Sequence, residues 1–305
     1  MLSNLAYKGC IFFNEELLET MRSDVDIYQY VYDGVWTIDT FTSLIKDSYV
    51  DLNFDQRANL GDFYGYAVAG PDREIEAMNI TVTERDGDGF SIALNSPEIV
   101  NSFEKLLKLV YNNNSTLKLP QITGSFEQIL SEFTVGNLMF MSGVMSHAAE
   151  FTDDEFEFGI LPMYKYSEEQ PEYYHTDYGT SNVMSIPAVC DTSRHEMIGA
   201  VLELLAAESY RQLTPAYFEI VFKYRYLRTE DGDTRDFDMY DIIRETGNYN
   251  FGFSYSDSWA VQPLTILRDI VNENPSGFAS YFGQIQGVLE QSLANTLEKL
   301  DNIPY

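Results

Sequence analysis

An acidic, asparagine-rich loop at residues 51–62 carries the clearest metal-ligand spacing in this sequence. Its oxygen-bearing side chains stand at positions 1, 3, 5, 9 and 12 of an EF-hand-like loop, and they are Asp51, Asn53, Asp55, Asn59 and Asp62. The carbonyl of Arg57 falls at position 7, but Gln56 replaces the glycine of such loops, and Asp62 replaces the longer glutamate. Two interpretations stay open, which are a Ca²⁺ site and a solvated loop whose Asp and Asn form Asx-turns.

Motifs that carry catalysis are missing from the sequence. None of His147, His175 and His195 stands in a His-Glu-x-x-His pattern, and there is no Gly-x-Ser-x-Gly elbow or phosphate-binding glycine loop. Carboxylates are so numerous that no pair can be singled out as a glycosidase pair. The sequence therefore predicts a protein that is not an enzyme and requires no cofactor. A carbohydrate-active hydrolase that uses its acidic residues is the alternative.

The charge of the chain limits its partners. The 305 residues include 48 acidic and 19 basic side chains, a formal net charge of -29. A nucleic-acid binder needs a basic surface, so nucleic acid is excluded as an expected partner. No stretch approaches the ~18 apolar residues of a membrane span. The first residues also lack the pattern of a secretory signal.

Strand and helix signals alternate in the first half of the chain. Residues 10–13 predict a strand, with Asn14 as the cap of the helix that follows, and Thr37 caps another helix. The segments 80–84 and 90–94 alternate in polarity around Asp-Gly-Asp-Gly, which predicts a hairpin. Ser96 and Pro97 then begin a helix.

The second half continues this alternation. Three apolar runs, at 138–141, 158–161 and 183–186, predict strands that are buried on both faces. Ser193 and Glu196 have the spacing of a capping box, which predicts a long helix to Glu208 with an apolar face. Residues 229–241 predict a charged, solvated connection. A final amphipathic helix is predicted from Phe278 to about Leu300. Strands interleaved with helices indicate an α/β protein with a mixed sheet.

Several stretches, in order, resemble family 1 extracellular solute-binding proteins, the class that includes maltose-binding protein. Each motif is short, and the resemblance depends on their order and spacing across most of the chain. The matching stretches are Ile11–Leu18, similar to FFNKDLL; Asp33–Thr37, similar to GKWTWD; Asp51–Gly65, similar to DLNGDG; Phe133–Gly143, similar to F..GKAAM; Phe158–Met163, similar to YGILPLP; and Ile186–Pro187 with the helix Glu196–Glu208.

This resemblance implies one solute-binding region over residues 1–305 with a periplasmic-binding-protein-like (type II) fold. The first motif, at residue 11, follows a complete α/β lobe in the family. We therefore expect mostly the C-terminal lobe and an incomplete N-terminal lobe, with a mixed sheet flanked by helices. The signal peptide and the lipid-anchoring cysteine are also expected to be absent. The full-length parent is expected to be extracellular and membrane-anchored.

The resemblance also implies capture of a carbohydrate between two lobes and delivery to ABC transporter permease subunits. Aromatic faces stack on sugar rings in such sites, while amides and carboxylates bind the hydroxyls. The expected ligand contacts are Trp36, Tyr64, Met145, Tyr178 and Trp259, and Met145 stands where the family often has tryptophan. Core packing is the alternative for each aromatic side chain. A fragment without binding activity of its own is the alternative for the whole chain.

Overall fold

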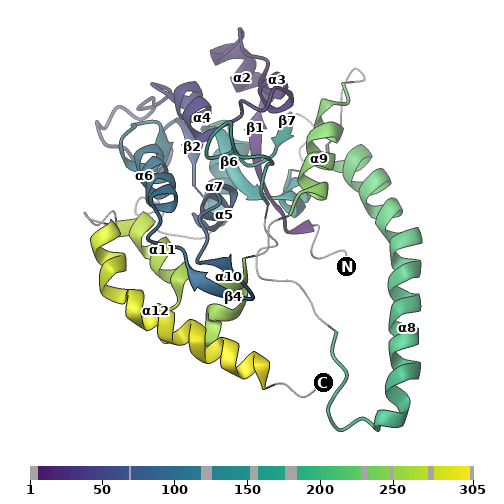
Figure 1. Cartoon of the computed structure of the whole chain (residues 1–305). Coiled ribbons are helices and arrows are strands. Elements are labelled where there is room, and N and C mark those ends of the chain that lie inside the picture. Colours follow the sequence, from purple (N-terminus) through teal and green to yellow (C-terminus); the bar gives the residue numbers. More distant parts are fainter. Residues whose placement is uncertain are drawn as a thin grey trace.

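A mixed β-sheet forms the centre of the computed structural model, which describes residues 6–68, 70–117, 126–151, 157–175, 184–227, 233–247, 250–273 and 278–302. Within these residues the sheet has five strands in the order β5-β2-β6-β1-β7 (Figure 1). β1 is antiparallel to both β6 and β7, whereas β2 is parallel to β5 and β6. The strands are β1 (Gly9–Asn14), β2 (Tyr64–Ala67), β5 (Thr116–Leu117), β6 (Leu138–Val144) and β7 (Phe158–Leu161).

The strands form where the sequence has continuous apolar runs. Every residue of β1, β6 and β7 is buried, as expected for strands covered on both faces. Phe12 lies opposite Met141 on one side and Ile160 on the other. The strand predictions at 10–13, 138–141 and 158–161 are therefore confirmed.

Short capped helices connect the first two strands. α2 (Glu15–Met21), α3 (Ile27–Tyr32) and α4 (Ile38–Ile45) follow β1 in the chain. The Asn14 side chain accepts a hydrogen bond from the Leu17 amide at 2.9 Å, and the Thr37 hydroxyl accepts one from the Thr40 amide at 3.3 Å. Both predicted caps thus satisfy amides that the first helical turn leaves without partners.

The predicted hairpin and the helix after it are also present. β3 (Thr83–Asp86) pairs with β4 (Gly89–Ile92) across a tight turn. Gly87 adopts a φ of 58° there, which glycine tolerates without a steric cost. α5 (Asp72–Ala77) precedes the hairpin, and α6 (Pro97–Tyr111) follows it, capped by Ser96. α7 (Phe126–Thr134) then leads into β6.

Four further helices follow in the chain, which are α9 (Arg235–Glu245), α10 (Phe251–Tyr255), α11 (Pro263–Glu273) and α12 (Phe278–Asp301). Of these, α9 lies beside β7 and the other three lie in the lower part of the molecule in Figure 1. α12 buries Phe282, Leu289 and Leu293 on one face, which confirms the predicted amphipathic helix. No helix of the described residues is long and apolar enough to cross a bilayer.

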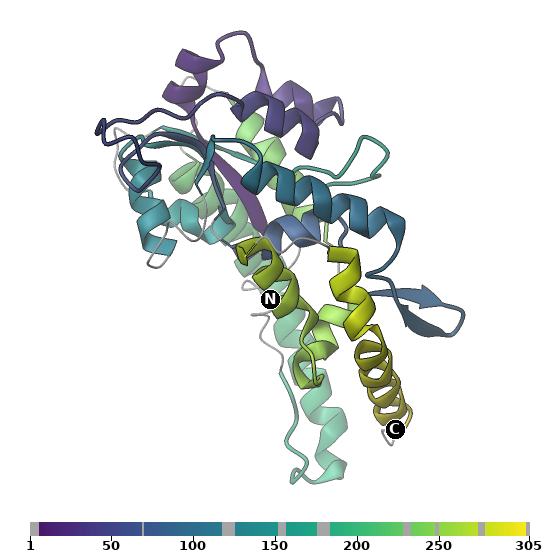
Figure 2. The ribbon, with the colours of Figure 1, turned by 90° about the vertical axis from the view of Figure 1, so that its left-hand side faces the viewer.

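The helix α8 (His195–Glu208) departs from its prediction. It continues into wider, π-helical turns at Ser209–Leu213 and Ala216–Tyr226, and Figures 1 and 2 show it extending away from the sheet. No residue of α8 is buried. Its apolar face is exposed, because no other layer of the described structure covers it. The exposed side chains are Met197, Val201, Leu204 and Leu205.

The segment before α8 also differs from its prediction. The capping box is wrong, because a 3-10 turn at Thr192–Arg194 precedes α8 and its cap residue makes no side-chain bond. The Asp191 carboxylate caps that turn instead, accepting from the Ser193 amide at 2.9 Å. Of the run at 183–186, Val183 lies outside the described residues. The remaining three residues form no strand, and Met184 is 74% exposed.

Candidate functional site

A cavity of about 330 Å³ lies beside the acidic loop, at the β5 edge of the sheet. We call it the tyrosine cavity, because the rings of Tyr49 and Tyr64 lie side by side with their centroids 5.3 Å apart. Aromatic, amide, carboxylate and hydroxyl groups meet here, the combination that binds polyhydroxylated ligands. The cavity is lined by Tyr49, Asp51, Gln56, Ala58, Tyr64, Asn114 and Thr116.

The acidic loop next to this cavity is held together by its own side chains. The Asp51 carboxylate accepts hydrogen bonds from the amides of Phe54 at 2.7 Å and Gln56 at 2.9 Å. Gln56 has a φ of 62°, in the left-handed region that glycine favours. Asp62 is buried and accepts from the Tyr49 hydroxyl at 3.1 Å. The loop therefore makes the turn expected at its sixth position without the expected glycine.

These hydrogen bonds bear on the two interpretations of the loop. The Asn53 and Asp55 side chains each accept from the amide two residues further on, that of Asp55 and that of Arg57, both at 2.8 Å, and this is the bond of an Asx-turn. Within the described residues, no three His, Cys, Asp or Glu side chains are grouped so that they could hold a metal ion. The described loop thus has the bonds of the Asx-turn alternative. Calcium binding by Asp51, Asn53, Asp55, Asn59 and Asp62 stays a prediction.

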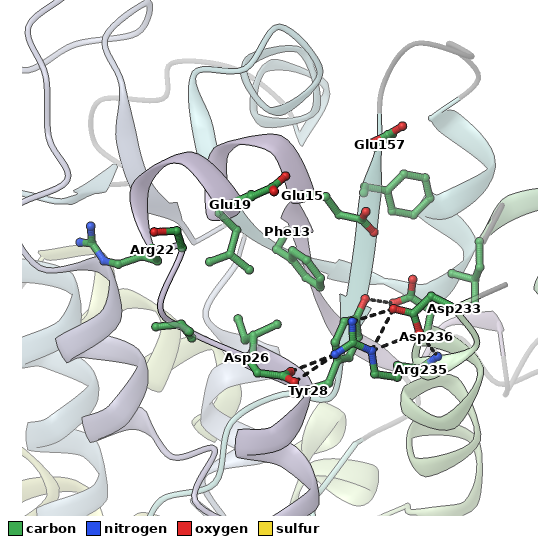
Figure 3. Close-up of a pocket in the computed structure, with 16 residues that line it drawn as sticks. Phe13, Glu15, Glu19, Arg22, Asp26, Tyr28, Glu157, Asp233, Arg235 and Asp236 are labelled. Atoms are coloured by element: carbon green, nitrogen blue, oxygen red, sulfur yellow. Dashed lines mark hydrogen bonds and ion pairs between the residues drawn. The ribbon is translucent and has the colours of Figure 1, made fainter. Parts of the chain in front are cut away.

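A second cavity, of about 410 Å³, lies between α2, α3, β7 and the start of α9 (Figure 3). We call it the acidic cavity, because its wall includes Glu15, Glu19, Asp26, Glu157, Asp233 and Asp236. Segments about two hundred residues apart in the sequence meet here. One contact across it is the hydrogen bond that the Tyr28 hydroxyl donates to Asp236 Oδ1 at 3.0 Å.

Asp236 is the most unusual group in this cavity. Only 6% of it is exposed, and Oδ1 also accepts a hydrogen bond from the Ile160 amide at 2.8 Å. Burial raises the pKa of its carboxyl to about 7, with smaller contributions from the Glu15 and Asp233 charges. The Ile160 amide and the Tyr28 hydroxyl oppose this shift. The carboxyl therefore changes its charge close to neutral pH.

Three of the predicted ligand contacts lie in the core. Trp36 is 0% exposed, and its indole Nε1 donates to the Pro162 carbonyl at 2.9 Å. Trp259 is 5% exposed and donates from Nε1 to the Thr296 hydroxyl at 2.9 Å, and Met145 is fully buried. These contacts are those of core side chains. A ligand role for the three stays a prediction.

The other two predicted contacts have different outcomes. Tyr64 lines the tyrosine cavity together with Asp51, although only 1% of Tyr64 is exposed. Its hydroxyl donates to the Asn59 carbonyl at 3.1 Å, which ties the strand β2 to the acidic loop. Tyr178 lies outside the described residues.

Sequence reasoning missed Asp236, because the segment 229–241 was expected to be a solvated connection. Residues 228–232 lie outside the described residues, but α9 begins at Arg235, so the second half of that prediction is wrong. The buried residues of α9 are Asp236, Met239, Tyr240 and Ile243. Their spacing of three and four is the signal that indicates a helix with one buried face.

The mixed sheet and its flanking helices form a periplasmic-binding-protein-like, type II fold, as predicted. Neither a protein-family model nor a curated protein sequence matches the chain. UspC of M. tuberculosis, in its monoclinic crystal form, is similar with a TM-score of 0.57 and 14% identity, over 94% of this chain and 73% of that one. An identity this low shows the fold alone.

Two further solved structures have the same fold. The maltose/maltodextrin-binding domain MalE of Bdellovibrio bacteriovorus, bound to maltotriose, has a TM-score of 0.54 and 15% identity, over 97% of this chain and 71% of that one. An ABC transporter solute-binding protein of Agrobacterium radiobacter K84, in complex with ribitol, has a TM-score of 0.53 and 16% identity, over 95% of this chain and 69% of that one.

Proposed function

We propose that this chain is the solute-binding component of an ABC importer and that it captures a carbohydrate. The observation that carries the proposal is the fold, which extends over 94–97% of the chain and is shared with three solved structures. Two of those proteins are bound to maltotriose and to ribitol, respectively. The ordered motifs of the sequence support the same class of protein.

The tyrosine cavity is the part of the described surface that we propose for a carbohydrate contact. The half-buried Tyr49 ring offers an apolar face, while Gln56, Asn114 and Asp51 offer groups that bind hydroxyls. Contacts by Trp36, Met145 and Trp259 belong to the same proposal, but these side chains would first have to leave their present core positions. A contact by Tyr178 also belongs to it.

The remaining parts of the proposal follow from this role. Ligand binding shifts a population of conformations toward the one that fits the solute, and that conformation docks to the permease subunits. The chain has no chemistry of its own in this proposal. Its full-length parent is extracellular and anchored to the membrane.

Maltotriose and ribitol are the first probes for this proposal. A ligand that binds only the folded state stabilises it by about 2.7 kcal/mol at a hundredfold excess over its Kd. We expect a saturable rise in melting temperature with one class of saccharide or polyol, confirmed by titration calorimetry. We also expect no hydrolysis of nitrophenyl glycosides, and clear turnover would favour the hydrolase alternative.

Two exposed side chains of the tyrosine cavity allow a test of the site itself. Gln56→Ala combined with Asn114→Ala removes hydroxyl-binding amides without disturbing the core, since both residues are exposed. The matched control is Gln291→Ala on the exposed face of α12. We expect the double variant to weaken binding about tenfold and the control to leave it unchanged. Equal affinities in all three proteins would place the site elsewhere.

A further inference from the structure

The floor of the acidic cavity is apolar. Phe13, Leu18, Ile27, Phe158 and Leu227 line it, and all five are buried. They come from β1, α2, α3, β7 and the end of the long helix that includes α8. A ligand in this cavity would therefore meet an apolar floor below an acidic wall, which suits a molecule with a short hydrocarbon body.

The positive charges at the cavity are engaged with other groups. The guanidinium of Arg235 pairs with Asp26 at 3.1 Å and with Asp233 at 2.6 Å, and it stacks over the Tyr28 ring (Figure 3). Arg22 donates to backbone carbonyls, including that of Leu44 at 2.8 Å. Because both basic residues are engaged in this way, they do not neutralise all of the negative charge of the acidic wall.

Three acidic groups of the wall have no cation partner among the described residues. They are Glu19 and Glu157, which are exposed, and Asp236, which is buried. Asp236 Oδ1 accepts two hydrogen bonds, whereas Oδ2 accepts none from the described residues. Oδ2 is not one of the fully buried atoms without a partner, so it keeps access to the cavity. A donor supplied by a ligand would complete this carboxylate.

An organic cation fits these features better than a metal ion does. Within the described part of the chain, no three acidic, cysteine or histidine side chains are grouped closely enough to hold a metal. The volume of about 410 Å³ lies in the range of small-molecule sites. The net charge of -29 also raises the local concentration of cations.

We propose that the acidic cavity is a binding site for a small alkylammonium or alkyldiammonium compound. Its methylene chain lies on the apolar floor, and its ammonium group donates to Asp236 and pairs with the acidic rim at Glu19. This site is separate from the tyrosine cavity, so the proposal does not depend on carbohydrate binding. The two residues that bind the ammonium group, Asp236 and Glu19, lie in none of the motifs of the sequence.

The proposed site predicts a dependence on pH. The groups that face Asp236 are Tyr28 on α3, Glu15 on α2, and Asp233 and Arg235 before and at the start of α9. The pKa of Asp236 is raised to about 7, so its carboxyl is neutral at pH 6 and ionised at pH 8. An alkylammonium group stays charged over this interval. Binding should therefore strengthen as the pH rises from 6 to 8.

The test is a calorimetric titration of the full chain with butane-1,4-diamine at low salt. Butan-1-ol and butyrate are the neutral and anionic probes of similar length. We expect saturable binding of the diamine alone, weakened about tenfold by Asp236→Asn and about threefold by Glu19→Gln. Because Glu19 is exposed, its variant keeps the test valid if Asp236→Asn does not fold.

A matched control separates a site from general attraction to an acidic protein. Glu84→Gln removes one charge from the exposed face of the hairpin and should leave the diamine affinity unchanged. Equal weakening by Glu84→Gln and Glu19→Gln would overturn the proposal, since only long-range charge would then act. Equal binding of butan-1-ol, or no saturable binding of the diamine, would overturn it as well.

Discussion

At the scale of single residues, Asp236 couples folding to pH in an uncommon direction. Its pKa is raised from 3.8 to about 7 by burial, so between these values the folded chain holds a proton that the unfolded chain releases. The free energy of unfolding therefore falls as the pH rises through this window. Between pH 5 and 7 this loss should amount to about 2 kcal/mol.

The variant Asp236→Asn isolates this contribution. Its amide oxygen can accept the bonds from Tyr28 and Ile160 and carries no charge at any pH. Urea unfolding at pH 5 and pH 7 should show that wild type loses about 2 kcal/mol more than the variant does. Asp257→Asn, on the surface, should follow wild type. Parallel curves for wild type and Asp236→Asn would mean that the carboxyl titrates normally.

A substitution at Trp36 tests whether this residue is a core side chain or a ligand contact. The indole is fully buried, contacts the Phe41 ring edge-to-face, and donates to the Pro162 carbonyl. Trp36→Ala should cost about 3–5 kcal/mol of unfolding free energy. The exposed Tyr210, changed to Ala, should cost less than about 0.5 kcal/mol. A small loss at Trp36, together with lost saccharide binding, would instead assign it to the ligand site.

At the scale of elements, α8 and α12 show how far an apolar stripe can be interpreted. Both helices repeat apolar residues at helical spacing, yet only α12 buries them. Leu289 on α12 is 0% exposed, whereas Leu204 on α8 is 66% exposed. Leu289→Ala should therefore cost about 2–5 kcal/mol and Leu204→Ala less than about 0.5 kcal/mol, measured by urea unfolding.

The opposite result for α8 would be informative. A loss of several kcal/mol from Leu204→Ala would show that another layer covers α8 in solution. Val201→Ala, at a position that is 51% exposed on the same face, provides the replicate. If both substitutions are costly and the cost depends on protein concentration, association between chains would provide that cover.

The elements also show which predictions the sequence could support. Caps such as Asn14, Thr37 and Ser96, and the hairpin turn at Gly87, depend on neighbours within a few residues, and all are confirmed. The burial of α8 depends on a second layer, and no local pattern encodes whether that layer is present. The described part of the predicted strand, residues 184–186, forms no strand for the same reason, because a strand needs a partner strand.

The candidate sites were less predictable, because they depend on the whole topology. Tyr64 and Asp51 could be selected from their motif, and they do line one cavity. The acidic cavity joins Tyr28 to Asp236 across 208 residues of sequence, which requires β7 to lie beside β1. That strand order is not written in any local pattern. The burial of Asp236 in this cavity therefore could not be predicted from the sequence, because it depends on the position of α9.

At the scale of the whole molecule, the net charge of -29 opposes folding through self-repulsion. Added salt screens this repulsion, since the Debye length falls from about 30 Å at 0.01 M to about 10 Å at 0.1 M. Any stabilisation by calcium must therefore be measured against sodium at the same ionic strength. Without that comparison, screening and a specific site cannot be separated.

The last prediction concerns the acidic loop as a calcium site. Calcium must compete with the amides of Phe54 and Gln56 for the Asp51 carboxylate, so we expect a weak site of about millimolar Kd, as in extracellular modules. At matched ionic strength, CaCl₂ should raise the melting temperature more than NaCl or MgCl₂ does. The substitution Asp55→Asn should remove this additional rise. Asp257→Asn, with the same charge change outside the loop, should keep it. Identical shifts with all three salts would leave the loop as a set of Asx-turns, since screening alone would then explain the stabilisation.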